Sequence, residues 1–127
     1  MKVRCLIVDD EVPATELLAS YLTRIEDFEI SAICTNALDA FTFLQKNPID
    51  LVFLDIQMPR MSGLELMRSL PEKPSVIFTT AYREYGADAF ELDALDYLVK
   101  PITFDRLLKA IAKFNQQILF RKGLEQT

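Results

Sequence analysis

The sequence predicts a single α/β domain built on a five-stranded parallel sheet with helices on both faces. Five short apolar runs alternate along the 127 residues with segments in which apolar residues recur at helical spacing. Neither a linker nor an internal repeat divides the chain, and 50% of its residues are hydrophobic, which is enough for one core. The run at 51–55 does not alternate between apolar and polar residues, as expected for a strand buried on both faces.

The expected strands are rich in β-branched and aromatic residues, and polar or turn-forming residues follow them. They are residues 3–8, 28–34, 51–55, 75–80 and 94–99. Parallel neighbours need right-handed crossovers that are long enough to contain a helix, which gives a doubly wound sheet. For five strands we expect the order 2-1-3-4-5 of the flavodoxin-like fold.

The first three crossovers are expected to contain helices. Pro13 suits the first turn of the first helix, and Thr35 or Asn36 caps the second, which ends near Pro48. A short third helix covers residues 64–70. The inward faces of the first two helices are Leu17, Leu18, Tyr21, Leu22 and Ile25, and then Ala37, Ala40, Phe41 and Leu44.

The sequence predicts the last of the five helices much more strongly than the one before it. Residues 82–92 predict a weak helix, because Gly86 interrupts it and few of its residues are apolar. Thr103 caps the final helix, and beyond residue 117 the apolar periodicity is lost. The inward residues are Ala87, Phe90 and Leu92 in the weak helix and Phe104, Leu107, Leu108, Ile111 and Phe114 in the final one. We therefore expect a domain at 1–117, followed at 118–127 by a tail or the start of a linker to an absent output domain.

Charge and cysteine content exclude several classes of function. The net charge of −5 opposes binding of a phosphate backbone by this domain, so contact with DNA would need a further module. Cys5 and Cys34 fall in early strands and are expected to be reduced core thiols. The N-terminal apolar run is too short for a signal peptide or a membrane span, which predicts a cytoplasmic protein without a membrane partner.

Chemically compatible side chains follow four of the strands. In the expected order the first and third strands are neighbours, so Asp9, Asp10 and Asp55 meet at the carboxyl edge of the sheet, and Thr80 and Lys100 end the next two strands. Carboxylates that gather without His or Cys favour a hard cation such as Mg²⁺. We expect Asp10, Asp55 and the carbonyl of Gln57 as direct ligands, with Asp9 acting through water.

A carboxylate beside Mg²⁺, an ammonium group and a hydroxyl is the arrangement that phosphoryl transfer to an aspartate requires. Asp55 is then the nucleophile, and Lys100 and Thr80 stabilise the transferring group. Each residue alone has a simpler interpretation: an aspartate after a strand often caps a turn, and a lysine is usually a surface charge. The coincidence of compatible groups at four strand ends favours a site.

The motifs at these strand ends, in this order, resemble the receiver domain of a bacterial two-component response regulator, the CheY-like family. They are Leu6-Ile7-Val8-Asp9-Asp10-Glu11, Asp55-Ile56-Gln57-Met58-Pro59 with Gly63 following, Thr80-Ala81, and Asp96-Tyr97-Leu98-Val99-Lys100-Pro101. The resemblance implies a phosphoacceptor regulator rather than a classical enzyme. Asp55 would accept phosphate from a histidine kinase or a small phosphodonor, and the domain would assist this transfer and its own slow dephosphorylation. A cis bond before Pro101 would aim Lys100 at the phosphate.

The same resemblance implies a switch made by Thr80 and Tyr97, which would alter the face formed by the weak helix, the fifth strand and the final helix. The bottom-up alternative for Tyr97 is a half-buried strand aromatic. The sequence is also similar to receivers that precede a LytTR-type DNA-binding domain, through Phe78-Thr79-Thr80-Ala81-Tyr82, Tyr85, Ala89-Phe90-Glu91 and Ala94-Leu95-Asp96-Tyr97. A bulky Tyr82 beside the site predicts a long-lived phosphorylated state.

Several alternatives stay open from the residues alone. A Mg²⁺-dependent phosphohydrolase would need a second acid two residues after the nucleophile, where this chain has Gln57. A degenerate receiver would lack the acceptor or the lysine, and a flavin carrier would show a hydroxyl-rich loop after the first strand. A homodimer could form if exposed charges of the switch face pair between copies, namely Glu91, Asp96, Arg106, Lys109 and Lys113.

Overall fold

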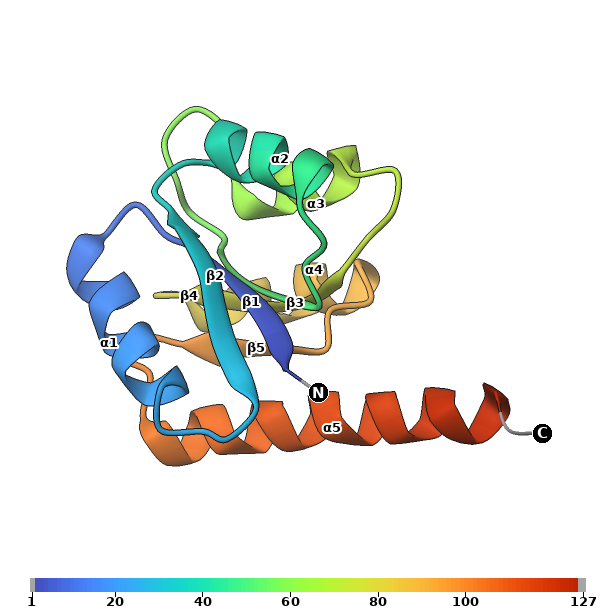
Figure 1. Ribbon diagram of the computed structural model, residues 1–127. Helices are drawn as coiled ribbons and strands as arrows, with labels where there is room; N and C mark the ends of the chain where they lie inside the picture. Colours follow the sequence, from blue (N-terminus) through green and yellow to red (C-terminus); the bar gives the residue numbers. More distant parts are fainter. Residues whose placement is uncertain (1, 126–127) are drawn as a thin grey trace.

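The computed structural model describes residues 2–125 and contains the expected five-stranded parallel sheet (Figure 1). The strand order is β2-β1-β3-β4-β5, which confirms the prediction. All neighbouring strands pair in parallel, with a register irregularity between Cys5 and Leu6 where β1 meets β2. The strands are β1 (Val3–Val8), β2 (Phe28–Cys34), β3 (Leu51–Asp55), β4 (Ser75–Thr80) and β5 (Asp96–Val99).

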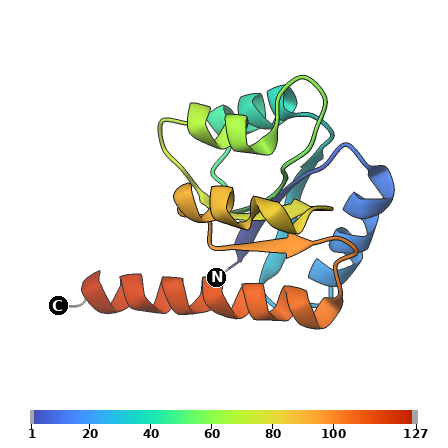
Figure 2. The same ribbon diagram turned by 180° about the vertical axis from the view of Figure 1, so that it is seen from behind.

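Helices cover both faces of the sheet, with α1 and α5 on one side and α2, α3 and α4 on the other (Figures 1 and 2). A 3₁₀ turn, η1 (Arg83–Tyr85), leads directly into α4, so the weak helix of the sequence is short and divided. The helices are α1 (Val12–Leu22), α2 (Ala37–Lys46), α3 (Gly63–Ser69), α4 (Gly86–Glu91) and α5 (Phe104–Glu125).

Local capping explains where two of these helices begin. Asn36 caps α2, because its side-chain oxygen accepts a hydrogen bond of 2.8 Å from the backbone N–H of Asp39. Ser62 and Glu65 form a capping box at the start of α3, each side chain bonding the other's backbone N–H at 3.1 Å. The capping box fixes the start of α3 just after the loop that follows β3.

The sheet separates two apolar cores, and β3 contributes to both. Val52 and Leu54 pack beneath α2 and α3, whereas Leu51 and Phe53 pack against α1 and α5. No residue of β3 is more than 3% exposed, which agrees with the prediction of a strand buried on both faces.

Four predicted core residues are instead exposed: Leu17 is 40%, Leu108 is 42% and Phe90 is 83% exposed, and Ala87 is exposed as well. In α1 and α5 the buried stripe runs through Leu18 and Leu107, and the neighbouring residue is turned about 100° away from it. Helix α4 is too short to carry a full stripe, and among its residues only Ala89 is buried.

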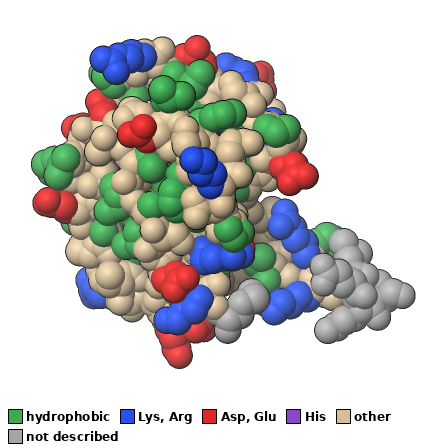
Figure 3. All heavy atoms as spheres, turned by 45° about the horizontal axis from the view of Figure 1, so that its top comes forward, with side chains coloured by type: hydrophobic (Ala, Val, Ile, Leu, Met, Phe, Trp, Pro, Cys, Tyr) green, Lys and Arg blue, Asp and Glu red, His purple; other side chains and the backbone are tan. Residues whose placement is uncertain are grey.

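Helix α5 does not end near residue 117 but continues to Glu125, past the edge of the sheet (Figures 1 and 2). Its last polar contact with the sheet is a 3.0 Å hydrogen bond from Ser75 Oγ to Gln117 Oε1. Beyond that contact Leu119 and Phe120 are each 68% exposed, and Figure 3 shows the end of α5 standing out from the body with Lys and Arg side chains on it. Losing the apolar stripe ends packing but does not end a helix that meets no proline.

Candidate functional site

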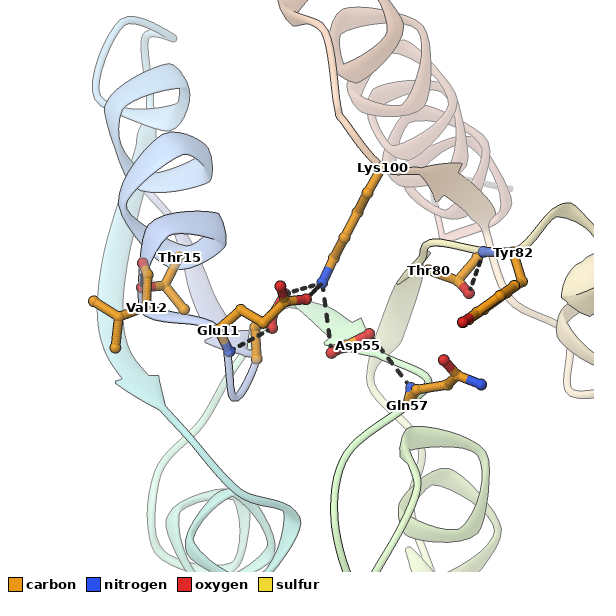
Figure 4. Close-up of polar contacts among 9 residues, drawn as sticks. Glu11, Val12, Thr15, Asp55, Gln57, Thr80, Tyr82 and Lys100 are labelled. Atoms are coloured by element: carbon orange, nitrogen blue, oxygen red, sulfur yellow. Dashed lines mark hydrogen bonds and ion pairs between the residues drawn. The ribbon is translucent and has the colours of Figure 1, made fainter.

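The candidate site lies at the carboxyl edge of the sheet, where four strands end. Asp9 follows β1, Asp55 ends β3, Thr80 ends β4 and Lys100 follows β5. Figure 4 shows the Lys100 side chain reaching from the end of β5 to the space between Glu11 and Asp55. The parallel order 2-1-3-4-5 therefore brings together groups that are 91 residues apart in the sequence, from Asp9 to Lys100.

Lys100 is the one cation within 4 Å of these carboxylates in the described part of the chain. Its Nζ lies 2.8 Å from Asp9 Oδ2, 2.9 Å from Glu11 Oε1 and 3.5 Å from Asp55 Oδ2. Asp9 also accepts a 2.9 Å hydrogen bond from the backbone N–H of Glu11, which folds the loop after β1 around the lysine. Asp9 and Asp55 are buried, whereas Glu11 is exposed.

Burial and the neighbouring charge of Asp9 raise the pKa of Asp55 to about 7, although Lys100 and the backbone N–H of Gln57 act in the opposite direction. Burial lowers the pKa of Lys100, but its contacts with Asp9 and Glu11 outweigh this, and the pKa is raised above its ordinary value. The same lysine lowers the pKa of Glu11. At neutral pH one ammonium thus faces several carboxyl groups whose repulsion it only partly relieves.

We name the set Asp9, Asp10, Glu11 and Asp55 the acidic pocket. One carboxylate oxygen from each of these residues lies within 4.8 Å of all the others. Four oxygen donors with a single lysine leave an excess of negative charge, and this donor set fits a hard divalent cation such as Mg²⁺. The structure thus brings together the three aspartates that the sequence predicted as ligands.

The sequence did not single out Glu11, although the acidic run Asp9-Asp10-Glu11 was the signal for it. Only the structure shows that its carboxylate holds Lys100. Gln57 lies beside the pocket, and its backbone N–H donates to Asp55 Oδ1 at 3.3 Å. A role of the Gln57 carbonyl as a metal ligand stays a prediction.

Thr80 is fully buried at the end of β4, and its Oγ1 accepts a 3.0 Å hydrogen bond from the backbone N–H of Tyr82. In Figure 4 Thr80, Tyr82 and Gln57 lie on the side of Asp55 away from Glu11. The Thr80 hydroxyl is therefore hydrogen-bonded to the loop that joins β4 to η1. This loop links the site to α4.

Two backbone features shape the pocket. A Cβ at Gly63 would collide with the backbone carbonyl of Asp55, so only glycine allows α3 to begin this close to the end of β3. The peptide bond between Lys100 and Pro101 is cis, as the resemblance implied.

Tyr97 of β5 is half-buried and lies against the first residue of α4. A Cβ built at Gly86 would come within 2.8 Å of the Tyr97 hydroxyl and ring. Gly86, which from the sequence only weakened a helix, is therefore the residue that lets the ring pack there. The participation of Tyr97 in a switch stays a prediction.

The charges of the expected dimer face are arranged differently from the prediction. Asp96 is only 9% exposed and receives two 2.9 Å hydrogen bonds from the Arg106 guanidinium, while Lys113 Nζ lies 3.2 Å from it. We name these three residues the β5–α5 clamp. The expectation that Asp96 is exposed was wrong, because it is buried and pairs within the chain, whereas pairing of Arg106 and Lys113 between copies stays a prediction.

Cys5 and Cys34 are free and buried, as expected. Burial raises the pKa of the Cys5 thiol to about 12, and it also raises that of Cys34. A thiol that stays protonated at neutral pH is a poor nucleophile, so both cysteines act as packing residues.

Among residues 2–125 there is no helix with the length and apolar character needed to cross a membrane. The elongated α5 contains several charged residues, including Lys109, Lys113, Arg121 and Lys122.

Comparison with known proteins identifies the family. Residues 5–112 match the family model of the response regulator receiver domain. The transcriptional regulatory protein BtsR of Escherichia coli is 46% identical over 117 residues, which are 91% of this chain and 49% of that protein. The chain spans about half the length of the curated relatives it matches.

Solved structures agree with this. The response regulatory domain of MrkE from Klebsiella pneumoniae has a TM-score of 0.83 and 33% identity, covering 91% of this chain and 97% of that one. CheY in the CheX–CheY–BeF3–Mg complex from Borrelia burgdorferi has a TM-score of 0.76 and 28% identity, covering 86% of both chains. The chain belongs to the response regulator receiver domain family.

Proposed function

We propose that this receiver domain is a phosphoacceptor switch in which Asp55 accepts a phosphoryl group from the phosphohistidine of a histidine kinase. The observation that carries the proposal is a buried carboxylate at a strand end, with a lysine ammonium 3.5 Å away and three further acidic groups around it. A structural ion pair would not need four carboxylates for one lysine. The exchange with a kinase implies a cytoplasmic location.

In the transfer, an oxygen of the ionised Asp55 attacks phosphorus, and the bond from phosphorus to the histidine nitrogen breaks with its electron pair staying on nitrogen. Bound Mg²⁺ would neutralise charge on the phosphoryl oxygens, and Asp10, Asp55, the Gln57 carbonyl and, through water, Asp9 would hold it. The ammonium of Lys100 and the hydroxyl of Thr80 would bind the transferring phosphoryl oxygens. Lys100 must then exchange some of its contacts with Asp9 and Glu11 for the phosphoryl group.

We propose further that Thr80 transmits phosphorylation to Tyr97 and α4. Thr80 Oγ1 now accepts a hydrogen bond from Tyr82, and a hydroxyl that turns to donate to a phosphoryl oxygen would alter that contact. The loop and η1 lead directly to Gly86, against which the Tyr97 ring packs. A short helix with one buried residue is a suitable bistable element.

The output lies outside this domain. The relative BtsR is named a transcriptional regulatory protein, and this chain covers about half of it. We propose that the chain acts on transcription through an attached DNA-binding domain of LytTR type, with a boundary near residue 117 and α5 leading toward it. A homodimer through α4, β5 and α5 would pair exposed charges of that face between copies, such as Glu91, Lys109 and Lys113, while Asp96 is buried.

The lifetime of the phosphorylated state is expected to be long. Tyr82 is 46% exposed and its side chain stands beside the site in Figure 4. The ring would hinder the approach of water to a phosphoryl group on Asp55, so Tyr82→Ala should speed dephosphorylation. Equal lifetimes of the two proteins would contradict this role.

The proposal is tested by intact mass after incubation with acetyl phosphate and Mg²⁺. We expect one phosphoryl adduct, which disappears in Asp55→Asn and when EDTA removes the metal. Asp96→Asn is the matched control, because Asp96 is a buried aspartate outside the acidic pocket and its variant should still form the adduct. Absence of an adduct on the native chain, with no binding of beryllofluoride, would reject the switch.

A further inference from the structure

We infer that Tyr85 is a positioning residue that restrains Gln57 and thereby slows hydrolysis of the phosphorylated Asp55. The phenol oxygen of Tyr85 accepts a 3.1 Å hydrogen bond from the Gln57 side-chain amide, Nε2. This bond joins the loop after β3 to η1, two segments 28 residues apart. The inference rests on the proposed function of Asp55.

Gln57 is placed where its carboxamide could act on water. Its backbone nitrogen lies 3.3 Å from Asp55 Oδ1, so its side chain starts at the edge of the acceptor. A carboxamide both donates and accepts hydrogen bonds and can therefore orient an attacking water, as glutamine does in some nucleotide hydrolases. In Figure 4, however, the Gln57 side chain extends away from Asp55, toward the side of Tyr82.

Tyr85 is a suitable anchor because its ring is held from two sides. It is half-buried against the core beneath α3 and α4, and the Tyr82 ring meets it edge-on at a centroid distance of 6.4 Å. A fixed phenol keeps the Gln57 amide on the α4 side of the site, where it cannot align water with phosphorus. The exposed Gln57 would otherwise be free to turn toward Asp55.

Hydrolysis of phosphorylated Asp55 exchanges one bond to phosphorus for another. A water oxygen attacks phosphorus, the bond from phosphorus to the Asp55 oxygen breaks, and its electron pair returns to the carboxylate. The proton released by water passes to the departing phosphate or to solvent. The Gln57 carboxamide would accept a hydrogen bond from this water without gaining or losing a proton.

The experiment measures how fast the adduct is lost after acetyl phosphate is removed by desalting, in the presence of Mg²⁺, by intact mass. Tyr85→Phe removes only the phenol oxygen and should speed the loss roughly threefold to tenfold, which corresponds to one hydrogen bond. Tyr21→Phe is the matched control, because it removes another 3.1 Å phenol hydrogen bond, to the Ile102 carbonyl, on the other side of the sheet.

A double-mutant cycle separates positioning from a general structural effect. In Gln57→Met, which keeps the backbone and the side-chain length but has no carboxamide, adding Tyr85→Phe should not change the rate. Loss of the acceleration in this background supports the inference. An unchanged rate in Tyr85→Phe, or the same acceleration with and without the carboxamide, overturns it. No adduct on the native chain would reject the proposed function itself.

Discussion

Two clusters of charged side chains flank β5, and they have opposite charge balance. At the end of the strand the acidic pocket gathers four carboxylates, three of which contact Lys100, whereas at its start the β5–α5 clamp gathers two cations around Asp96. The pKa values of the two buried aspartates, Asp55 and Asp96, are shifted in opposite directions. Burial and Asp9 raise the pKa of Asp55, while hydrogen bonds from Arg106 and Lys113 outweigh burial and lower the pKa of Asp96.

The difference separates a structural ion pair from a site that is ready for a ligand. Asp96 has every contact that its charge requires within the chain, so it stabilises the join between β5 and α5. Asp55 is a buried carboxylate whose neighbours are mainly acidic, and Lys100 and the backbone N–H of Gln57 offset their effect on its ionised form only in part. An excess of like charge that the fold itself does not neutralise is therefore the better mark of function.

The largest expected effect comes from removing the charge of Lys100, the lysine that contacts the acidic pocket. Lys100→Met should slow formation of the adduct from acetyl phosphate about 10²- to 10³-fold, the usual cost of deleting one charge-stabilising donor. The time course of intact mass at fixed Mg²⁺ measures it. Lys113→Met in the β5–α5 clamp is the control and should leave the time course unchanged, and equal effects of the two variants would contradict the distinction.

Breaking the β5–α5 clamp should cost stability. Asp96→Asn is expected to lower the free energy of unfolding by about 2 kcal/mol at pH 7, because Arg106 loses a charged partner while staying partly open to solvent. Urea unfolding measures this. Since the pKa of Asp96 is lowered in the folded state, its contribution is present above about pH 3.8, the ordinary value, and disappears as pH falls through the lower folded value. The difference between the proteins should therefore close in acid, and a difference that persists there would point to packing instead.

Removing an aspartate charge from the acidic pocket should change the free energy of unfolding in the opposite direction. Asp55→Asn is expected to raise the free energy of unfolding of the metal-free protein by about 1 to 2 kcal/mol at pH 8, because a neutral amide escapes the repulsion by Asp9. The folded pKa of Asp55 lies near 7, above its ordinary 3.8, so ionisation destabilises the native protein progressively as pH rises between these values. The gain should be absent below pH 4 and should shrink when Mg²⁺ is added. A loss of stability at pH 8 would show that Lys100 already compensates the charge.

Much of the fold and of the acidic pocket could be predicted from the sequence, because strand ends and their polar residues follow from local patterns. The apolar run at 51–55, which does not alternate with polar residues, predicted a strand buried on both faces, and the parallel order then placed Asp9, Asp55 and Lys100 at one edge. Neither step needs side-chain geometry. Local patterns also predicted the weakness of the helix near Gly86 and a cap at Thr35 or Asn36, of which the structure shows Asn36.

The β5–α5 clamp and the Tyr85 contact could not be predicted in the same way. Whether Asp96 and Arg106 pair within one chain or between two depends on side-chain directions across two elements, which no sequence period encodes. The glycine at 86 matters because of a ring from another strand, a contact that is visible only in three dimensions. Leu17 and Leu108 were misplaced because neighbouring leucines left the phase of the stripe open.

The smallest expected effect distinguishes the two cations of the β5–α5 clamp. Lys113 has a side chain that is 52% exposed and a single 3.2 Å contact, whereas Arg106 makes two 2.9 Å hydrogen bonds to Asp96 and a third of 3.2 Å to the Tyr97 carbonyl. Lys113→Ala should therefore lower the free energy of unfolding by about 0.5 kcal/mol or less, as is usual for exposed ion pairs, and the effect should weaken with salt. Arg106→Ala should cost more and respond less to salt, because its contacts are directional and less exposed. Parallel urea titrations at low and high salt measure both. Equal losses would mean that Asp96 requires net positive charge rather than the geometry of the guanidinium, and the clamp would then resemble the acidic pocket in depending on charge balance alone.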